Sequence, residues 1–204
     1  GGIYPATEEF MRKVRALCDE RDILMILDEI QCGMGRTGTM FAWQRYGVKP
    51  DVMAVAKALG CGVPVGAFLM TEKVGANSLV AGDHGTTYGG NPLACAAVSK
   101  VIDLFQEQDV LANVNRVGAY LAKRLDELAA EFSCVETRRG VGLMQGLVFD
   151  RPVGEIITEA MERGLVLINA GTSIIRFVPP LVITEEHVDD MISILRESLR
   201  ACEA

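Results

Sequence analysis

Two short apolar runs, each closed by a charged side chain, constrain the fold of this chain more than any other feature. The first run covers residues 23–27 and ends at Asp28, and the second covers residues 52–56 and ends at Lys57. Runs that are apolar at every position are typical of parallel strands covered by helices on both faces. Parallel strands end at the same edge of a sheet, so both side chains are predicted to open onto one crevice.

The rest of the chain alternates between helical and extended patterns, which predicts an α/β fold. Helices are expected at residues 8–21, at 91–132 with a break near 108–109, at 153–163 and at 185–200. Further strands are expected at residues 65–70, 135–139, 141–149, 165–168 and 174–178. Asn91 followed by Pro92 has the residue types of a helix start.

The pattern predicts two domains. Residues 1–105 read as part of a larger domain with a mainly parallel sheet, residues 106–133 as a linking helical region, and residues 134–204 as a small α+β domain. The chain opens with two glycines and no Met and enters a helical pattern within a few residues. We therefore expect it to be a piece of a longer protein.

Composition argues against several classes of protein. The formal net charge is −7, from 20 Lys and Arg against 27 Asp and Glu, without a run of like charges, so nucleic acid is not an expected partner. No apolar stretch approaches the roughly 20 residues of a membrane span, and no signal pattern opens the chain, so a cytoplasmic protein without a membrane partner is expected. The six cysteines are scattered, which predicts free thiols, and the two histidines lie too far apart for a metal site.

Taken singly, neither Asp28 nor Lys57 identifies a chemistry. A carboxylate at the rim of an apolar core needs a partner, which could be a protonated ring nitrogen of a cofactor, the guanidinium of Arg36, or the N–H groups of a loop. A lysine at a strand end is either a solvated edge residue or, when desolvated, a nucleophilic amine. Both alternatives stay open on these residues alone.

Four longer motifs occur in order along the chain. They are LDEIQCGMGRTG at residues 27–38, KPDVMAVAKALGCGVPVGAF at 49–68, HGTTYGGNPLACAA at 84–97 and IIRFVPPLVIT at 174–184. This set resembles the class III (subgroup II) aminotransferases, which use pyridoxal 5'-phosphate, and is most similar to the acetylornithine and ornithine enzymes. The resemblance spans essentially the whole chain. It implies the C-terminal half of a fold-type I transferase, similar to aspartate aminotransferase, with residues 1–105 in the cofactor-binding large domain.

The resemblance also implies roles for individual residues. Lys57 would hold the cofactor covalently, Asp28 would bind its pyridine nitrogen and Gln31 would contact its phenolic oxygen. Thr87, with Thr86 beside it, would reach the cofactor phosphate of the other subunit, which implies a homodimer with a shared active site. From the residues alone, two hydroxyls among glycines near a helix start fit an ordinary turn equally well.

Arg176 has a physical argument of its own. Strand alternation places it on the same face as Ile174 and Val178, where a guanidinium needs an anionic partner such as a substrate carboxylate. The alternative is an edge-strand arginine whose stem lies on aliphatic surface and whose head is in water. The resemblance implies the α-carboxylate of glutamate, 2-oxoglutarate or an ornithine derivative.

The implied function is the transfer of an amino group between N-acetylornithine, or a related ω-amino compound, and 2-oxoglutarate in arginine biosynthesis. Succinylornithine, ornithine and 4-aminobutyrate remain alternative donors. The chain departs from the family pattern because the first half is missing. That half is expected to carry the glycine loop for the phosphate and the aromatic residue that stacks on the ring. The competing hypothesis is therefore a truncated, catalytically incompetent fragment whose exposed apolar surfaces favour association.

Overall fold

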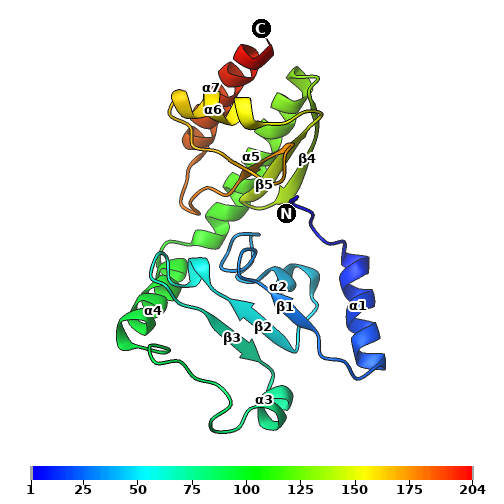
Figure 1. Cartoon of the computed structure of the whole chain (residues 1–204), viewed down its shortest axis with the longest axis vertical. Coiled ribbons are helices and arrows are strands. Elements are labelled where there is room, and N and C mark those ends of the chain that lie inside the picture. Colours follow the sequence, from blue (N-terminus) through cyan, green and yellow to red (C-terminus); the bar gives the residue numbers. More distant parts are fainter. Residues whose placement is uncertain (1, 204) are drawn as a thin grey trace. The chain divides into compact units, whose positions relative to one another are not determined.

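The structure is a computed structural model and describes residues 2–203. The chain forms two compact units, whose elements are labelled in Figure 1. One unit is Ala6–Leu111. The other runs from Ala112 onward and includes the N-terminal segment that ends at Pro5.

The unit Ala6–Leu111 contains a three-stranded sheet. Its strands are β1 (Ile26–Asp28), β2 (Val52–Val55) and β3 (Ala67–Met70), in the order β1-β2-β3. β1 and β2 pair in parallel, whereas β3 runs antiparallel to β2. The expected α/β class is confirmed, and the sheet as described is mixed.

The helices of this unit are α1 (Glu8–Glu20), α2 (Ala42–Tyr46), α3 (Glu72–Ser78), α4 (Pro92–Glu107) and the short 3₁₀ helix η1 (Lys57–Leu59). Two of them, α1 and α4, begin close to where local signals predict. The side chain of Asn91 accepts the N–H of Ala94, and Pro92 opens α4, as predicted from the cap residues. Helix α3 was not expected from the sequence.

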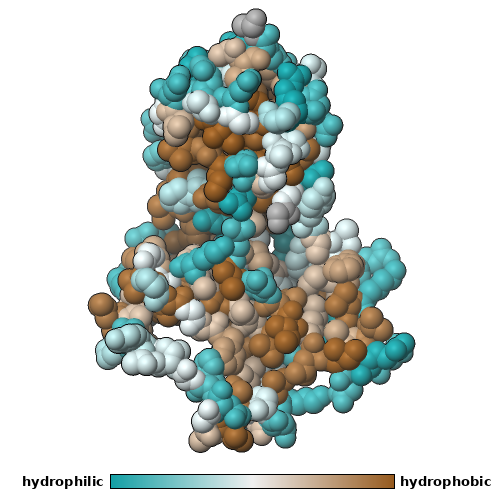
Figure 2. Space-filling model, viewed as in Figure 1, coloured by the Kyte–Doolittle hydropathy of each residue, from teal (hydrophilic) through white to brown (hydrophobic). Residues whose placement is uncertain are grey.

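Helices cover one face of this sheet and leave the other exposed. On one face, buried Met53 and Val55 pack with Met34 and Leu59 and with three side chains of α4, namely Val98, Val101 and Phe105. On the other, Ile26 is 64% exposed, and Ile23 and Leu24 just before β1 are also exposed. Figure 2 shows hydrophobic side chains gathered over β1. The expectation of helices on both faces is therefore wrong for the part of the chain described, and β1 is shorter than the apolar run.

The second unit is a four-stranded antiparallel sheet with helices. The strands are β4 (Val135–Val141), β5 (Met144–Phe149), β6 (Ile168–Asn169) and β7 (Ile174–Phe177), in the order β4-β5-β7-β6. The helices are α5 (Val110–Glu131), α6 (Gly154–Glu162) and α7 (Glu185–Glu203). Of the strand expected at 165–168, only Ile168 lies in a strand, and β6 continues from it to Asn169. The predicted helix break is confirmed, since Asp109 separates α4 from α5 with a positive φ of 47°.

The core of this unit lies where α5 and α7 bury leucine and isoleucine side chains at helical spacing. Fully or almost fully buried members are Leu121, Leu125, Leu128, Ile192, Leu195 and Leu199. The glycines in β4 and β5 mark close backbone approach: a Cβ on Gly140 would meet the carbonyl oxygen of Met144 at 2.2 Å. None of the helices within residues 2–203 is both long and apolar enough to cross a membrane.

Candidate active site

The ends of β1 and β2 bring Asp28 and Lys57 to the same edge of the sheet. Asp28 is paired with Ala54 in the parallel register, and Lys57 follows β2 after Ala56. Neighbouring parallel strands lie about 4.8 Å apart. The predicted parallel pairing of the two apolar runs is confirmed. Because the strands are parallel, the charged residues that follow them lie at the same edge of the sheet.

Asp28 lies on the open face of the sheet and is exposed. Its Oδ1 accepts the N–H of Ile30 at 2.9 Å, so one carboxylate oxygen closes a turn between residues 28 and 30. This is the loop contact considered from the sequence. The other oxygen, Oδ2, accepts no hydrogen bond from residues 2–203 and is available to a further N–H donor.

Lys57 has an unusual backbone. Its φ is 48°, in the left-handed region that costs an L-residue other than glycine about 1–2 kcal/mol. The side chain is exposed, and its amine forms no ion pair with any side chain in the part of the chain described. A strained, unpaired lysine at a strand end is an observation from which a functional role can be hypothesised.

Gln31 and Cys32 lie in the turn that follows Asp28. Gln31 is partly buried. The Cys32 thiol donates to the backbone oxygen of Asp28 at 3.5 Å and to a carboxylate oxygen of Glu29 at 3.4 Å. Burial, with the negative charge of Glu29 next in importance, raises the pKa of the Cys32 thiol to about 12, so it remains a protonated donor at neutral pH.

Glu29 is a site residue that the sequence reading overlooked. It is 2% exposed, and its two carboxylate oxygens accept the N–H groups of Ala42 and Trp43, each at 2.8 Å. A signal was present: strand alternation puts Glu29 on the same face as Leu27, where a charged residue needs buried partners.

Thr86 and Thr87 lie in an exposed loop that precedes α4 in the same unit. The backbone oxygen of Thr86 accepts the N–H of Gly89 at 3.2 Å, which is a turn contact. Asn91 then ends the loop by donating to the backbone oxygen of Tyr88 at 3.0 Å. Both hydroxyls therefore lie on an exposed surface of the unit that carries Asp28 and Lys57.

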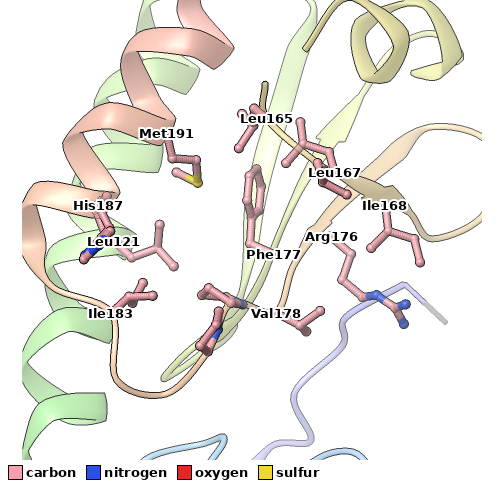
Figure 3. Close-up of a pocket in the computed structure, with 14 residues that line it drawn as sticks. Leu121, Leu165, Leu167, Ile168, Arg176, Phe177, Val178, Ile183, His187 and Met191 are labelled. Carbon is pink, nitrogen blue, oxygen red and sulfur yellow. The ribbon is translucent and has the colours of Figure 1, made fainter. Parts of the chain in front are cut away.

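Arg176 lies in the other unit, on β7, paired with Gly146 of β5 and with Ile168 of β6. It shares a partly buried face with Ile174, as strand alternation predicted. Its Nε is buried and has no hydrogen-bond partner within residues 2–203. Figure 3 shows the side chain projecting from the edge of an apolar pocket of about 380 Å³, away from Phe177 and Met191. A carboxylate ligand would satisfy this guanidinium.

The residues at the two strand ends and in the turn after β1 carry groups that could hold the ring of pyridoxal phosphate. Asp28 offers an unused carboxylate oxygen for a protonated ring nitrogen, Gln31 offers an amide for the phenolic oxygen, and Lys57 offers an amine for the aldehyde. A metal would need a different donor set, and nowhere in residues 2–203 do three His, Cys, Asp or Glu side chains come together as possible ligands. The unused carboxylate oxygen of Asp28 could pair with a protonated ring nitrogen of an organic cofactor.

Comparison with known proteins gives a consistent result. The profile of the Aminotransferase class-III family matches residues 1–199. The chain is 45% identical over 201 residues to the acetylornithine aminotransferase of Clostridium acetobutylicum, covering 98% of this chain and 52% of that protein. It is 42% identical over 197 residues to the acetylornithine aminotransferase of Methanocaldococcus jannaschii, covering 97% and 49%. The chain spans about half the length of the curated relatives it matches.

Solved structures similar to this chain are also aminotransferases. The N-acetylornithine aminotransferase from Stenotrophomonas maltophilia superposes with a TM-score of 0.86 at 39% identity, over 98% of this chain and 53% of that one. The ornithine delta-aminotransferase of Plasmodium falciparum superposes with a TM-score of 0.92 at 32% identity, over 98% and 52%.

Proposed function

We propose that this chain, which belongs to the class-III aminotransferase family, is the C-terminal half of a pyridoxal-phosphate-dependent aminotransferase and carries the residues that hold the cofactor ring. The observation that supports the proposal most strongly is the parallel pairing of β1 with β2, since it sets Asp28 and Lys57 at adjacent strand ends. Because the chain covers about half of its relatives, the activity of the whole enzyme is part of the proposal.

Lys57 and Asp28 would carry the central steps. When bound, pyridoxal phosphate supplies an electron sink for the substrate carbon that loses a proton. The Nζ of Lys57 would hold the cofactor through its aldehyde, and as a free amine it would move the proton at the substrate carbon. The Oδ2 of Asp28 would accept the proton-bearing ring nitrogen of the cofactor, and the turn contact of Oδ1 with Ile30 holds the carboxylate in place.

The remaining residues would orient the reactants. Gln31 donates its amide to the phenolic oxygen of the ring. Thr87, with Thr86 beside it, binds the cofactor phosphate held by a second subunit, so the active enzyme is a homodimer. The exposed position of both threonines is compatible with such a contact. Arg176 binds the carboxylate of the amino donor and of the acceptor, which supplies the missing partner of its buried Nε.

The proposed reaction moves an amino group from N-acetylornithine to 2-oxoglutarate, as part of arginine biosynthesis in the cytoplasm. Relatives named acetylornithine aminotransferase at 40–47% identity favour this donor. Ornithine is the second candidate, because the ornithine delta-aminotransferase of Plasmodium falciparum superposes with a TM-score of 0.92.

One experiment tests the cofactor assignment. Pyridoxal phosphate is added to the purified 204-residue chain, the adduct is reduced with borohydride, and the modified peptide is identified by mass spectrometry. The expected result is a reduced adduct at Lys57, absent from a Lys57→Ala variant. A chain that folds but takes no label would support the incompetent-fragment hypothesis, and a label on Lys49 in place of Lys57 would overturn the assignment.

The donor is tested in half-reactions of the loaded protein. N-acetylornithine, ornithine, succinylornithine and 4-aminobutyrate are compared by the loss of absorbance of the bound cofactor. The fastest change is expected with N-acetylornithine. Equal rates with 4-aminobutyrate would refute the proposed substrate.

A further inference from the structure

Asp28 and Glu29 are consecutive but lie on opposite faces of the sheet. The ladder continues past β1, because the N–H of Glu29 donates to the carbonyl oxygen of Ala54 at 2.9 Å. Strand alternation therefore still applies at Glu29 and turns its side chain to the covered face, where it is 2% exposed. Asp28 is left on the open face.

Both carboxylate oxygens of Glu29 are used. Oε2 accepts the N–H of Ala42 and Oε1 accepts the N–H of Trp43, each at 2.8 Å, and the Cys32 thiol donates to Oε2 at 3.4 Å. Helix α2 follows Phe41, which has no side-chain oxygen to cap it. Glu29 therefore satisfies, from a distant point in the sequence, two N–H groups that the helix leaves unpaired.

The backbone of Glu29 is held as firmly as its side chain. Its carbonyl oxygen accepts the N–H of Gly33 at 3.0 Å, which closes the turn containing Gln31. A Cβ at Gly33 would lie 2.7 Å from this oxygen, so only glycine fits there. Glu29 thus joins the end of β1, strand β2, the turn and α2.

We propose that Glu29 is a positioning residue for the cofactor site. It fixes the direction of the Asp28 carboxylate and the course of the turn carrying Gln31, without touching the cofactor itself. This inference rests on the proposed function and deepens it. An amide in place of the carboxylate would present an N–H to one of two backbone N–H donors, so that one buried donor would lose its partner.

A double-mutant cycle separates this role from general stabilisation. The half-saturation concentration for pyridoxal phosphate is measured by absorbance for the 204-residue chain and for Glu29→Gln, Asp28→Asn and the double variant. Glu29→Gln removes one charge-assisted hydrogen bond to the backbone of α2. If that loss is passed on to the Asp28 carboxylate, cofactor binding is expected to weaken about tenfold. Because Glu29 acts in large part through Asp28, it should weaken binding less in the Asp28→Asn background than in the parent chain. Fully additive effects would overturn the inference.

A second measurement needs no cofactor. Amide hydrogen exchange in Glu29→Gln is followed at Ala42 and Trp43, which lose an acceptor, and at Ile30, whose N–H bonds to Asp28. Faster exchange at all three amides is expected. Faster exchange at Ala42 and Trp43 with an unchanged rate at Ile30 would show that Glu29 only caps α2, and would overturn the inference whether or not the chain binds cofactor.

Controls come from two further variants. Glu29→Asp keeps a carboxylate and is expected to restore part of the binding lost in Glu29→Gln, and it replaces that variant if Glu29→Gln does not fold. Glu20→Gln alters a glutamate of the same unit whose side chain is 71% exposed, and should leave cofactor binding and Ile30 exchange unchanged. If the parent chain takes no label at Lys57, the proposed function fails, while the exchange result still decides the role of Glu29.

Discussion

The guanidinium of Arg15 in α1 donates to Oδ2 of Asp51 at 2.7 Å, and the same carboxylate oxygen accepts the N–H of Met25 at 2.7 Å. This pair ties α1 to the starts of both parallel strands. The N–H of Met25 and then the Arg15 hydrogen bond lower the pKa of Asp51 below its ordinary value. The two side chains are 19% and 22% exposed, so solvent screens them only in part.

Asp51→Asn is therefore expected to destabilise the chain in a pH-dependent way. A carboxyl group whose pKa is lowered in the folded state stabilises the fold at pH values above its ordinary pKa of about 4. This stabilisation is lost as the pH falls through the pKa of the folded state. At pH 6 the variant should lose about 1–2 kcal/mol of unfolding free energy, and the difference should shrink toward pH 2. Urea unfolding at several pH values measures this. Asp22→Asn, at a side chain 96% exposed, is the control, and an equal loss there would contradict the prediction.

The left-handed backbone of Lys57 leads to a second prediction. Glycine adopts a φ of 48° without the steric cost that any Cβ incurs, so Lys57→Gly should be about 1 kcal/mol more stable than Lys57→Ala. Both variants lose the amine and should take no borohydride-stable label. Comparing the urea midpoints of the two variants isolates the backbone effect. Because the lysine side chain is exposed, its removal costs little packing in either variant. Equal midpoints would show that the backbone at this position is unstrained.

Local signals in the sequence predicted much of the fold. Asn91-Pro92 predicted the start of α4, and the helix break expected near residues 108–109 lies at Asp109. The two apolar runs gave β1 and β2 and, through their parallel pairing, the edge shared by Asp28 and Lys57. These features depend on residues that are neighbours in the sequence or on continuous apolar runs, and both can be read from the sequence alone.

Other features depend on contacts that no local pattern encodes. The antiparallel direction of β3 is set by its pairing with β2, and the cap that Glu29 gives to Ala42 and Trp43 joins residues 13 and 14 positions apart. The positive φ of Lys57 has no sequence signal, because lysine is not a residue that favours it. The phosphate contact of Thr87 stays a prediction, since it requires a second chain.

Arg176 gives a third prediction, which depends on its lack of a partner. Removing a buried donor with no acceptor should cost little, so Arg176→Met is expected to change the unfolding free energy by less than about 1 kcal/mol. Binding of 2-oxoglutarate, followed by titration of the loaded protein, should weaken at least about tenfold with the loss of a charge-assisted contact.

The matched control is Arg196, which donates two hydrogen bonds to Glu131 at 2.7 and 2.9 Å. Arg196→Met should lower the urea midpoint more than Arg176→Met while leaving 2-oxoglutarate binding unchanged. The reverse order of midpoints would mean that Arg176 stabilises the fold, and would remove the argument that its guanidinium is reserved for a ligand.

The open face of β1 gives the last prediction. Ile26 is 64% exposed on a strand whose only partner within residues 2–203 is β2, so apolar side chains and an unpaired strand edge lie together. Such an edge favours association, and lysine on an edge strand opposes it. Ile26→Lys should therefore shift the chain toward smaller species in sedimentation velocity at high concentration, whereas Val182→Lys, at a residue 61% exposed in the other unit, should not. The same shift in both variants would attribute the effect to net charge, because each reduces the formal charge of −7 equally.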